Sequence, residues 1–142
     1  MDINNFHAIL GRTIMYCQII ENDIKLIYSA MLKGNMNDTF SKIKKEKWTL
    51  GKTISELKQL DNSDGDSYFG NEDYKLLKQI TKKRNHWCHE TYIVFVYTEN
   101  FGYSKEYQKE CLQLNKDHDQ LAELYKIVEN VRLQAMKDFN RI

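Results

Sequence analysis

The apolar positions in the first part of the chain recur at steps of three and four residues, which is the spacing of one face of an α-helix. They are Phe6, Leu10, Ile14, Cys17, Ile20, Ile24, Ile27 and Met31. Gly34 and Asn35 follow directly after this stripe, as is typical of a helix end. The pattern therefore predicts a first helix over 3–33.

A second helical pattern begins near Asp38 or Thr39 and ends at about Leu60. Its apolar positions are Phe40, Ile43, Trp48, Leu50, Ile54 and Leu57. Gly51 lies inside this pattern, and a glycine there costs about 1 kcal/mol relative to alanine. We therefore expect either a close contact with another helix or a break at that glycine.

The next segment, 61–73, is rich in Asp, Asn, Ser and Gly, and it predicts a solvated loop. A calcium loop of the EF-hand type does not fit this segment. With Gly65 at the sixth position, the first ligand would be Leu60 and the last would be Asn71, and neither suits that geometry.

A third helical pattern opens near Glu72 and includes Tyr74, Leu77, Ile80 and Trp87. The run 91–97 (TYIVFVY) that follows also suits a strand, because β-branched and aromatic residues favour extended backbone. No partner strand is predicted elsewhere in the chain. We therefore expect 91–97 to continue the helix, with apolar residues on nearly all sides, and to be buried.

The last helical pattern starts at Lys105 or Asn115 and reaches Phe139. Its stripe consists of Leu114, Leu121, Leu124, Ile127 or Val128, Val131, Ala135 and Phe139. Proline is absent from the chain, so no helix is interrupted by one. Four helices of this length joined by short loops predict an all-α fold, an up-down bundle of four to five helices. At 142 residues the chain is expected to form one domain over 1–142.

Amino-acid composition adds little to this prediction of an all-α domain. Apolar residues make up 42% of the chain, charged residues 29%, and the formal net charge is +1, so global charge does not indicate a nucleic-acid partner. Cys17, Cys88 and Cys111 are too widely spaced for a disulfide framework or a zinc ribbon. No signal-peptide pattern or membrane-length apolar run is present. We expect a cytoplasmic protein with no membrane segment, no metal and no cofactor.

Polar and ionisable side chains crowd into residues 82–92 (KKRNHWCHETY), within the helix that is expected to be buried. Burying such groups costs several kcal/mol unless they are paired. Asn85 and His89 are four residues apart and share a helix face, so the amide is placed to orient the imidazole. His86 and Tyr92 lie three residues before and after His89, on the same side of the helix.

Arg84 lies five residues before His89, about 140° away around an ideal helix. One helix does not aim both side chains at a common point, but two copies related by a two-fold axis can supply them to a shared cleft. A basic run with no acidic residue inside it suits a phosphate backbone. This run consists of Lys75, Lys78, Lys82, Lys83 and Arg84.

Residues 84–89 (RNHWCH) resemble the hallmark of the HEPN superfamily, an arginine followed by four to six residues and a histidine, often with asparagine directly after the arginine. The segment 49–57 (TLGKTISEL) is similar to a stretch in the preceding helix of some members. The resemblance covers most of the chain. Members often have a tyrosine two residues beyond the histidine, whereas this chain has Thr91 there and Tyr92 one position later.

The resemblance implies an all-helical, commonly dimeric protein that cleaves RNA without a metal. His89 would be the general acid or base toward the ribose 2′-hydroxyl, because an imidazole titrates near neutrality. Arg84 would hold the scissile phosphate through its planar guanidinium, and Asn85 would orient His89 or the phosphate. The candidate substrate contacts are Lys82, Lys83, His86 and Tyr92.

The resemblance also implies a toxin or a phage-defence protein, with an antitoxin or a nucleotidyltransferase-like protein as its partner. A non-catalytic helical module that binds another protein or RNA is the alternative. A metal site of His86, Cys88 and His89 is disfavoured because Cys88 faces elsewhere. A cysteine nucleophile is disfavoured because adjacent helix positions face apart. Trp48 and Trp87 are assigned to the core rather than to base stacking.

Overall fold

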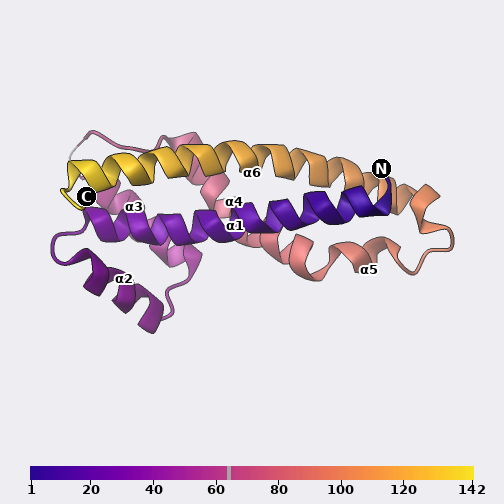
Figure 1. The fold of residues 1–142 in the computed structure, drawn as a ribbon, viewed down its shortest axis with the longest axis horizontal. Helices are drawn as coiled ribbons and strands as arrows, with labels where there is room; N and C mark the ends of the chain where they lie inside the picture. The colour runs from indigo at the N-terminus through magenta and orange to yellow at the C-terminus, as the bar shows by residue number, and fades with distance from the viewer. Residues whose placement is uncertain (64) are drawn as a thin grey trace. The chain divides into compact units, whose positions relative to one another are not determined.

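The computed structural model describes residues 1–63 and 65–142. These described residues form six α-helices and one short 3₁₀ helix, which are α1 (Ile3–Met31), α2 (Met36–Lys45), α3 (Leu50–Asp61), α4 (Asn71–His89), α5 (Thr91–Phe95), η1 (Phe101–Tyr103) and α6 (Lys105–Asp138). Figure 1 shows their arrangement. No β-strand occurs within these two described ranges, so the predicted all-α class is confirmed. None of the described helices combines the length and the apolar character needed to cross a membrane.

Tertiary contacts divide the chain into two compact units. Unit 1 consists of Met1–Gln18 and Ile80–Glu123, and unit 2 consists of Ile19–Gln79 and Leu124–Ile142. Helices α1, α4 and α6 each contribute residues to both units. The whole of the 82–92 segment belongs to unit 1.

The core of unit 1 is aromatic. Ring centroids lie 5.5 Å apart for Phe6 and Phe95, and 4.9 Å apart for Phe95 and Tyr107. The rest of the buried cluster consists of Leu10, Trp87, Cys111 and Leu114. Aromatic pairs of this kind contribute about 0.5–1.5 kcal/mol beyond the area they bury. They hold α5 in place although it has only five residues.

In unit 2, a buried carboxylate organises the chain after α3. Asp61 accepts hydrogen bonds from the backbone N–H groups of Tyr68 (2.7 Å) and Phe69 (3.1 Å) and from the Tyr74 hydroxyl (2.6 Å). Burial and this carboxylate raise the pKa of Tyr74, so its hydroxyl keeps the proton that it donates. The prediction of a solvated loop is therefore wrong for Asp61 and Phe69, which are both buried. Asp64, which belongs to the same segment, lies outside the described residues.

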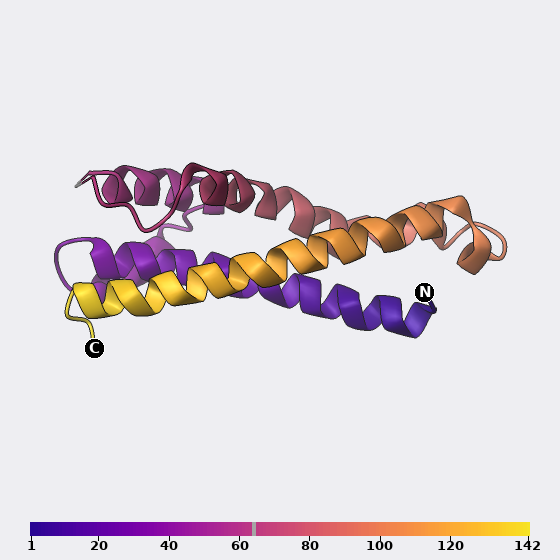
Figure 2. The ribbon, with the colours of Figure 1, turned by 90° about the horizontal axis from the view of Figure 1, so that it is seen from above.

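The last turns of α1 and α6 lie side by side in unit 2 and point the same way (Figure 1 and Figure 2). Arg141 donates to the carbonyl oxygens of Ala30 (3.0 Å) and Leu32 (2.9 Å), which the end of α1 leaves without helical partners. Further back, the Arg132 guanidinium lies 3.4 Å from the Asp23 carboxylate. Residue numbers rise together along the two helices, from the pair of Asp23 and Arg132 to the contacts of Ala30 with Arg141, so α1 and α6 are parallel in this unit.

In unit 1, α1 and α6 are parallel as well. The Tyr107 hydroxyl donates to the carbonyl oxygen of Met1 (2.8 Å), and the Arg12 guanidinium donates to the His118 imidazole (3.4 Å). The first and last helices of a four-helix up-down bundle run in opposite directions. The parallel course of α1 and α6 within each unit therefore does not fit the four-helix form of the predicted bundle.

The second predicted helical segment consists of two short helices. Helix α2 ends at Lys45, and Lys47 then takes a left-handed backbone conformation (φ 53°). The Thr49 hydroxyl caps the start of α3 by accepting from the Lys52 N–H (3.1 Å). The break thus lies before Gly51, which is inside α3. The side-chain cap at Thr49 sets where α3 begins and therefore where the break lies.

The first and last helical predictions agree with the structure except at Phe139, which lies beyond the end of α6 and is exposed. The stripe of α1 is buried except for Ile14, which is half-buried. Helix α6 begins at Lys105, the earlier of the two predicted starts, and Val128 is buried whereas Ile127 is exposed. In a helix whose stripe is this regular, period alone is sufficient to identify the buried face.

The prediction of a continuous, buried helix over 91–97 is wrong. Helix α4 ends at His89, and Glu90 separates it from α5 with a backbone (φ −122°, ψ −33°) outside the helical range. Thr91 and Phe95 point into the core, whereas Ile93 is 65% and Tyr97 86% exposed. Other elements thus cover only one side of α5.

Candidate functional site

The candidate motif occupies the last turns of α4, and helical period separates its residues by burial. Trp87 is buried, Arg84 and His86 are half-buried, and Asn85 and His89 are exposed. The expectation of a polar cluster buried in a central helix is therefore wrong. A helix with one buried face presents the remaining motif residues to solvent, where their polarity carries no desolvation cost.

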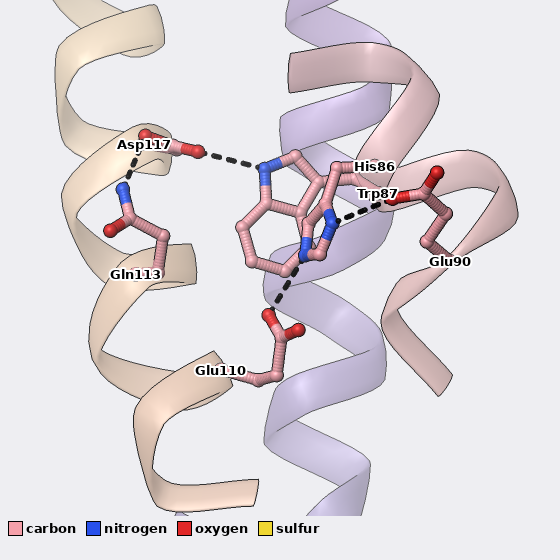
Figure 3. Close-up of polar contacts among 6 residues, drawn as sticks. All are labelled: His86, Trp87, Glu90, Glu110, Gln113 and Asp117. Atoms are coloured by element: carbon pink, nitrogen blue, oxygen red, sulfur yellow. Dashed lines mark hydrogen bonds and ion pairs between the residues drawn. The ribbon is translucent and has the colours of Figure 1, made fainter. Parts of the chain in front are cut away.

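Trp87 anchors the motif to α6 through a buried hydrogen bond. Its indole N–H donates to Oδ2 of Asp117 (2.9 Å), as Figure 3 shows. The other carboxylate oxygen, Oδ1, accepts from the Gln113 amide (3.0 Å) and lies 3.2 Å from the Lys83 ammonium. Asp117 is thereby satisfied inside the unit, and Trp87 is a core residue as predicted.

Lys83 belongs to this network. Besides its ion pair with Asp117, its ammonium donates to the Gln120 side chain. Lys82, one position earlier, is exposed. Of the two lysines expected to contact a substrate, Lys83 holds α4 against α6 and Lys82 faces solvent.

His86 is held between two glutamates (Figure 3). Its Nε2 lies 2.9 Å from Oε2 of Glu110 on α6, and its Nδ1 lies 3.3 Å from Oε2 of Glu90. Burial by itself lowers the pKa of His86, but the hydrogen bonds and charges of the two carboxylates outweigh it, and the net shift is upward. Two acceptors favour a ring that is protonated on both nitrogens. His86 thus joins α4 to α6 through its two carboxylate contacts, and neither ring nitrogen is left for a substrate.

His89 differs from His86 in its surroundings. Its side chain is exposed, and it makes no hydrogen bond or ion pair with any residue in the described part of the chain. The same holds for Asn85, so the expected hydrogen bond between these two side chains does not form among the described residues. His89 is therefore the motif histidine whose ring nitrogens are accessible from solvent.

Tyr92 turns toward the start of α1. Its hydroxyl lies 2.5 Å from Nδ1 of His7, and its ring packs edge-on against Phe6 with centroids 5.7 Å apart. Burial raises the pKa of Tyr92. This tyrosine, a predicted substrate contact, is half-buried and is bound to α1.

Three residues of this region were not singled out from the sequence, namely His7, Glu110 and Asp117. For the acidic pair a signal existed, since Glu110 and Asp117 lie on the apolar stripe of α6 with Leu114 and Leu121 at steps of three and four. A carboxylate at a core position needs a partner. For His7 there was no such signal, because it lies beside the stripe of α1 and 85 residues from Tyr92.

Among the described residues, no group of three or more His, Cys, Asp or Glu side chains is placed to hold a metal ion. The metal site considered from the sequence used His86, which is bound to two carboxylates, and Cys88, which is exposed. Searches against protein-family models, curated proteins and solved structures returned no match for this chain.

Proposed function

We propose that this chain is a metal-independent RNA endonuclease of the HEPN type, with Arg84, Asn85 and His89 at its site. One observation carries the proposal. Two histidines lie three residues apart in the motif, and the structure commits His86 to Glu110 and Glu90 while His89 stays exposed and unbonded among the described residues. The histidine required by the motif spacing is thus the one available for acid–base chemistry.

The reaction that fits these residues is attack by the neighbouring ribose hydroxyl. His89 would take the 2′-hydroxyl proton, and the 2′ oxygen would then bond to phosphorus while the bond to the 5′ oxygen breaks. After protonation of the leaving oxygen, the products are a 2′,3′-cyclic phosphate and a 5′-hydroxyl end. Arg84 would stabilise the charge that builds on the phosphate, and the exposed Lys82 would attract the RNA backbone.

A homodimer is part of the proposal, and the surface after the motif supports it. Ile93, Val94, Val96 and Tyr97 are exposed within a few residues of His89. Contiguous exposed apolar side chains favour association with a partner. A second copy bound across a two-fold axis would cover this surface and bring two sets of Arg84 and His89 to one cleft.

The test is cleavage of total cellular RNA by the purified protein in EDTA. We expect the wild-type protein to leave 2′,3′-cyclic phosphate ends and Arg84→Ala and His89→Ala to lose at least about a hundredfold in rate, as loss of a general acid–base or charge-stabilising group does. Cys88→Ala is the matched control, because Cys88 is an exposed neighbour on the same helix. Equal cleavage by wild type and His89→Ala would contradict the proposal.

The same exposed apolar surface also favours a second function, a helical module that binds another protein. Under this alternative the folded wild-type protein forms a stable complex and cleaves no RNA, and His89→Ala leaves complex formation unchanged. Growth arrest on expression separates the two functions, because arrest that His89→Ala abolishes requires the site rather than the surface.

A further inference from the structure

Two acidic residues of α6 hold two consecutive residues of the motif. Glu110 binds His86, and Asp117 binds Trp87 (Figure 3). Seven residues separate the two carboxylates, which is two helical turns, so both point from α6 toward α4. Because these two anchoring contacts lie two turns apart along α6, they fix the rotation of α4 about its own axis as well as its position along α6.

The two anchors differ in their chemistry. Asp117 accepts from the indole N–H and amide groups and also has the Lys83 ammonium beside it. Glu110 is 7% exposed, and among the described groups only the His86 imidazole pairs with its carboxylate. A buried carboxylate without a cationic partner is costly. Glu110 therefore stabilises the protonated form of His86.

The second nitrogen of His86 extends this contact to the end of the helix. Glu90 is the single residue between α4 and α5, and its side chain does not cap α5 but lies against Nδ1 of His86 (3.3 Å). The Glu90 backbone N–H donates to the His86 carbonyl oxygen (2.9 Å), which is the last helical hydrogen bond of α4. His89 lies directly before this junction.

We propose that Glu110 is a positioning residue for the candidate site: it keeps His86 cationic, and His86 in turn holds Glu90 and so sets where α4 ends and how His89 is presented. The consequence for catalysis rests on the proposed function, whereas the effect on the junction does not. The charged groups around His86 are Glu110 from α6 and Glu90 from its own chain segment, and the raised pKa of His86 agrees with this arrangement.

The decisive variant is Glu110→Gln, which keeps the shape of the side chain and removes its charge. We expect the pKa of His86, followed by NMR of its ring, to fall. We expect the backbone amides of Val94 and Val96, which donate to the carbonyl oxygens of Glu90 and Tyr92, to exchange with deuterium about tenfold faster, since a charge-assisted hydrogen bond contributes at least that factor. Amides of α3 in unit 2 should change much less, which separates this local effect from general destabilisation. Glu106→Gln, at an exposed glutamate one turn earlier on α6, is the matched control.

Glu90→Gln provides a second variant that does not endanger folding, because the Glu90 side chain is 69% exposed. It should also speed exchange of the Val94 and Val96 amides. In the RNA assay, Glu110→Gln should lower kcat about tenfold with KM nearly unchanged, because it acts on the geometry of His89 and not on RNA binding. Unchanged His86 titration and unchanged exchange in both variants would overturn the positioning role. Faster exchange together with no cleavage by wild type would retain it and reject the proposed function instead.

Discussion

At the scale of single residues, the two motif histidines show how surroundings assign chemical roles. His86 and His89 are three positions apart on one helix, yet one contacts two carboxylates and the other faces solvent. The difference comes from α6, because Glu110 reaches the half-buried side of α4 and not its exposed side. A histidine bound in this way stabilises structure, and a histidine left exposed is available for proton transfer.

The His86 contacts predict a pH dependence of stability. The folded-state pKa of His86 is raised, so its contribution is complete below the unfolded value of about 6.5 and is lost as pH rises through the folded pKa. We therefore expect the free energy of urea unfolding to differ more between wild type and His86→Leu at about pH 6 than at about pH 9. A difference that grows toward alkaline pH would contradict the ion pairs with Glu110 and Glu90.

Among the secondary-structure elements, α5 has one side packed against the core of unit 1 and an open side that is exposed to solvent. Phe95 packs against Phe6 and Tyr107, while Ile93 and Tyr97 face solvent. The non-helical backbone of Glu90 separates this short helix from α4. A short element with an aromatic anchor and an apolar outer side is suited to a protein interface.

This arrangement predicts that charge on the open side of α5 prevents dimerisation without unfolding the protein. Tyr97→Glu should shift the protein from dimer to monomer at micromolar concentration in sedimentation velocity, because a charged side chain is costly to bury. Its helical circular dichroism should stay unchanged, since Tyr97 is 86% exposed. Thr98→Glu, at the next exposed position, is the matched control. A monomeric wild-type protein under these conditions would refute the dimer.

At the scale of the whole molecule, α1, α4 and α6 each have residues in both units. Helix formation is cooperative along a chain, so a helix that melts in one unit loses support in the other. The single domain predicted from chain length is therefore expected to appear as one unfolding transition. Each unit contains one tryptophan, Trp87 in unit 1 and Trp48 in unit 2, which makes the expectation measurable.

We predict that Asp61→Ala lowers the urea midpoint reported by both tryptophans equally. The substitution leaves the donors of Tyr68, Phe69 and Tyr74 without their acceptor, at a cost of at least about 2 kcal/mol in the free energy of unfolding. Fluorescence of Trp48→Phe reports on Trp87, and that of Trp87→Phe reports on Trp48. Each is compared with and without Asp61→Ala. A shift confined to Trp48 would mean that the units unfold separately.

The amino-acid sequence alone predicted the all-α class, the course of α1 and α6 and the place of the motif on a helix. It did so because helical period is local, and each stripe places apolar residues such as Phe6 and Leu114 on a face that has to be covered. Period also predicted Trp87 as a core residue. It gave no correct account of the break at Lys47, where backbone conformation and the Thr49 cap outweigh the apolar pattern.

Packing between distant segments determines which side of α4 and of α5 is buried. The run 91–97 has apolar residues all round, so period cannot select the buried ones, and contact with Phe6 and Tyr107 selects Phe95. The same holds for the motif, in which the roles of His86 and His89 depend on Glu110, 24 residues from His86 in the chain. Local spacing specifies a helix and its faces, whereas the partner of each face is set by packing between distant segments, which no local pattern contains.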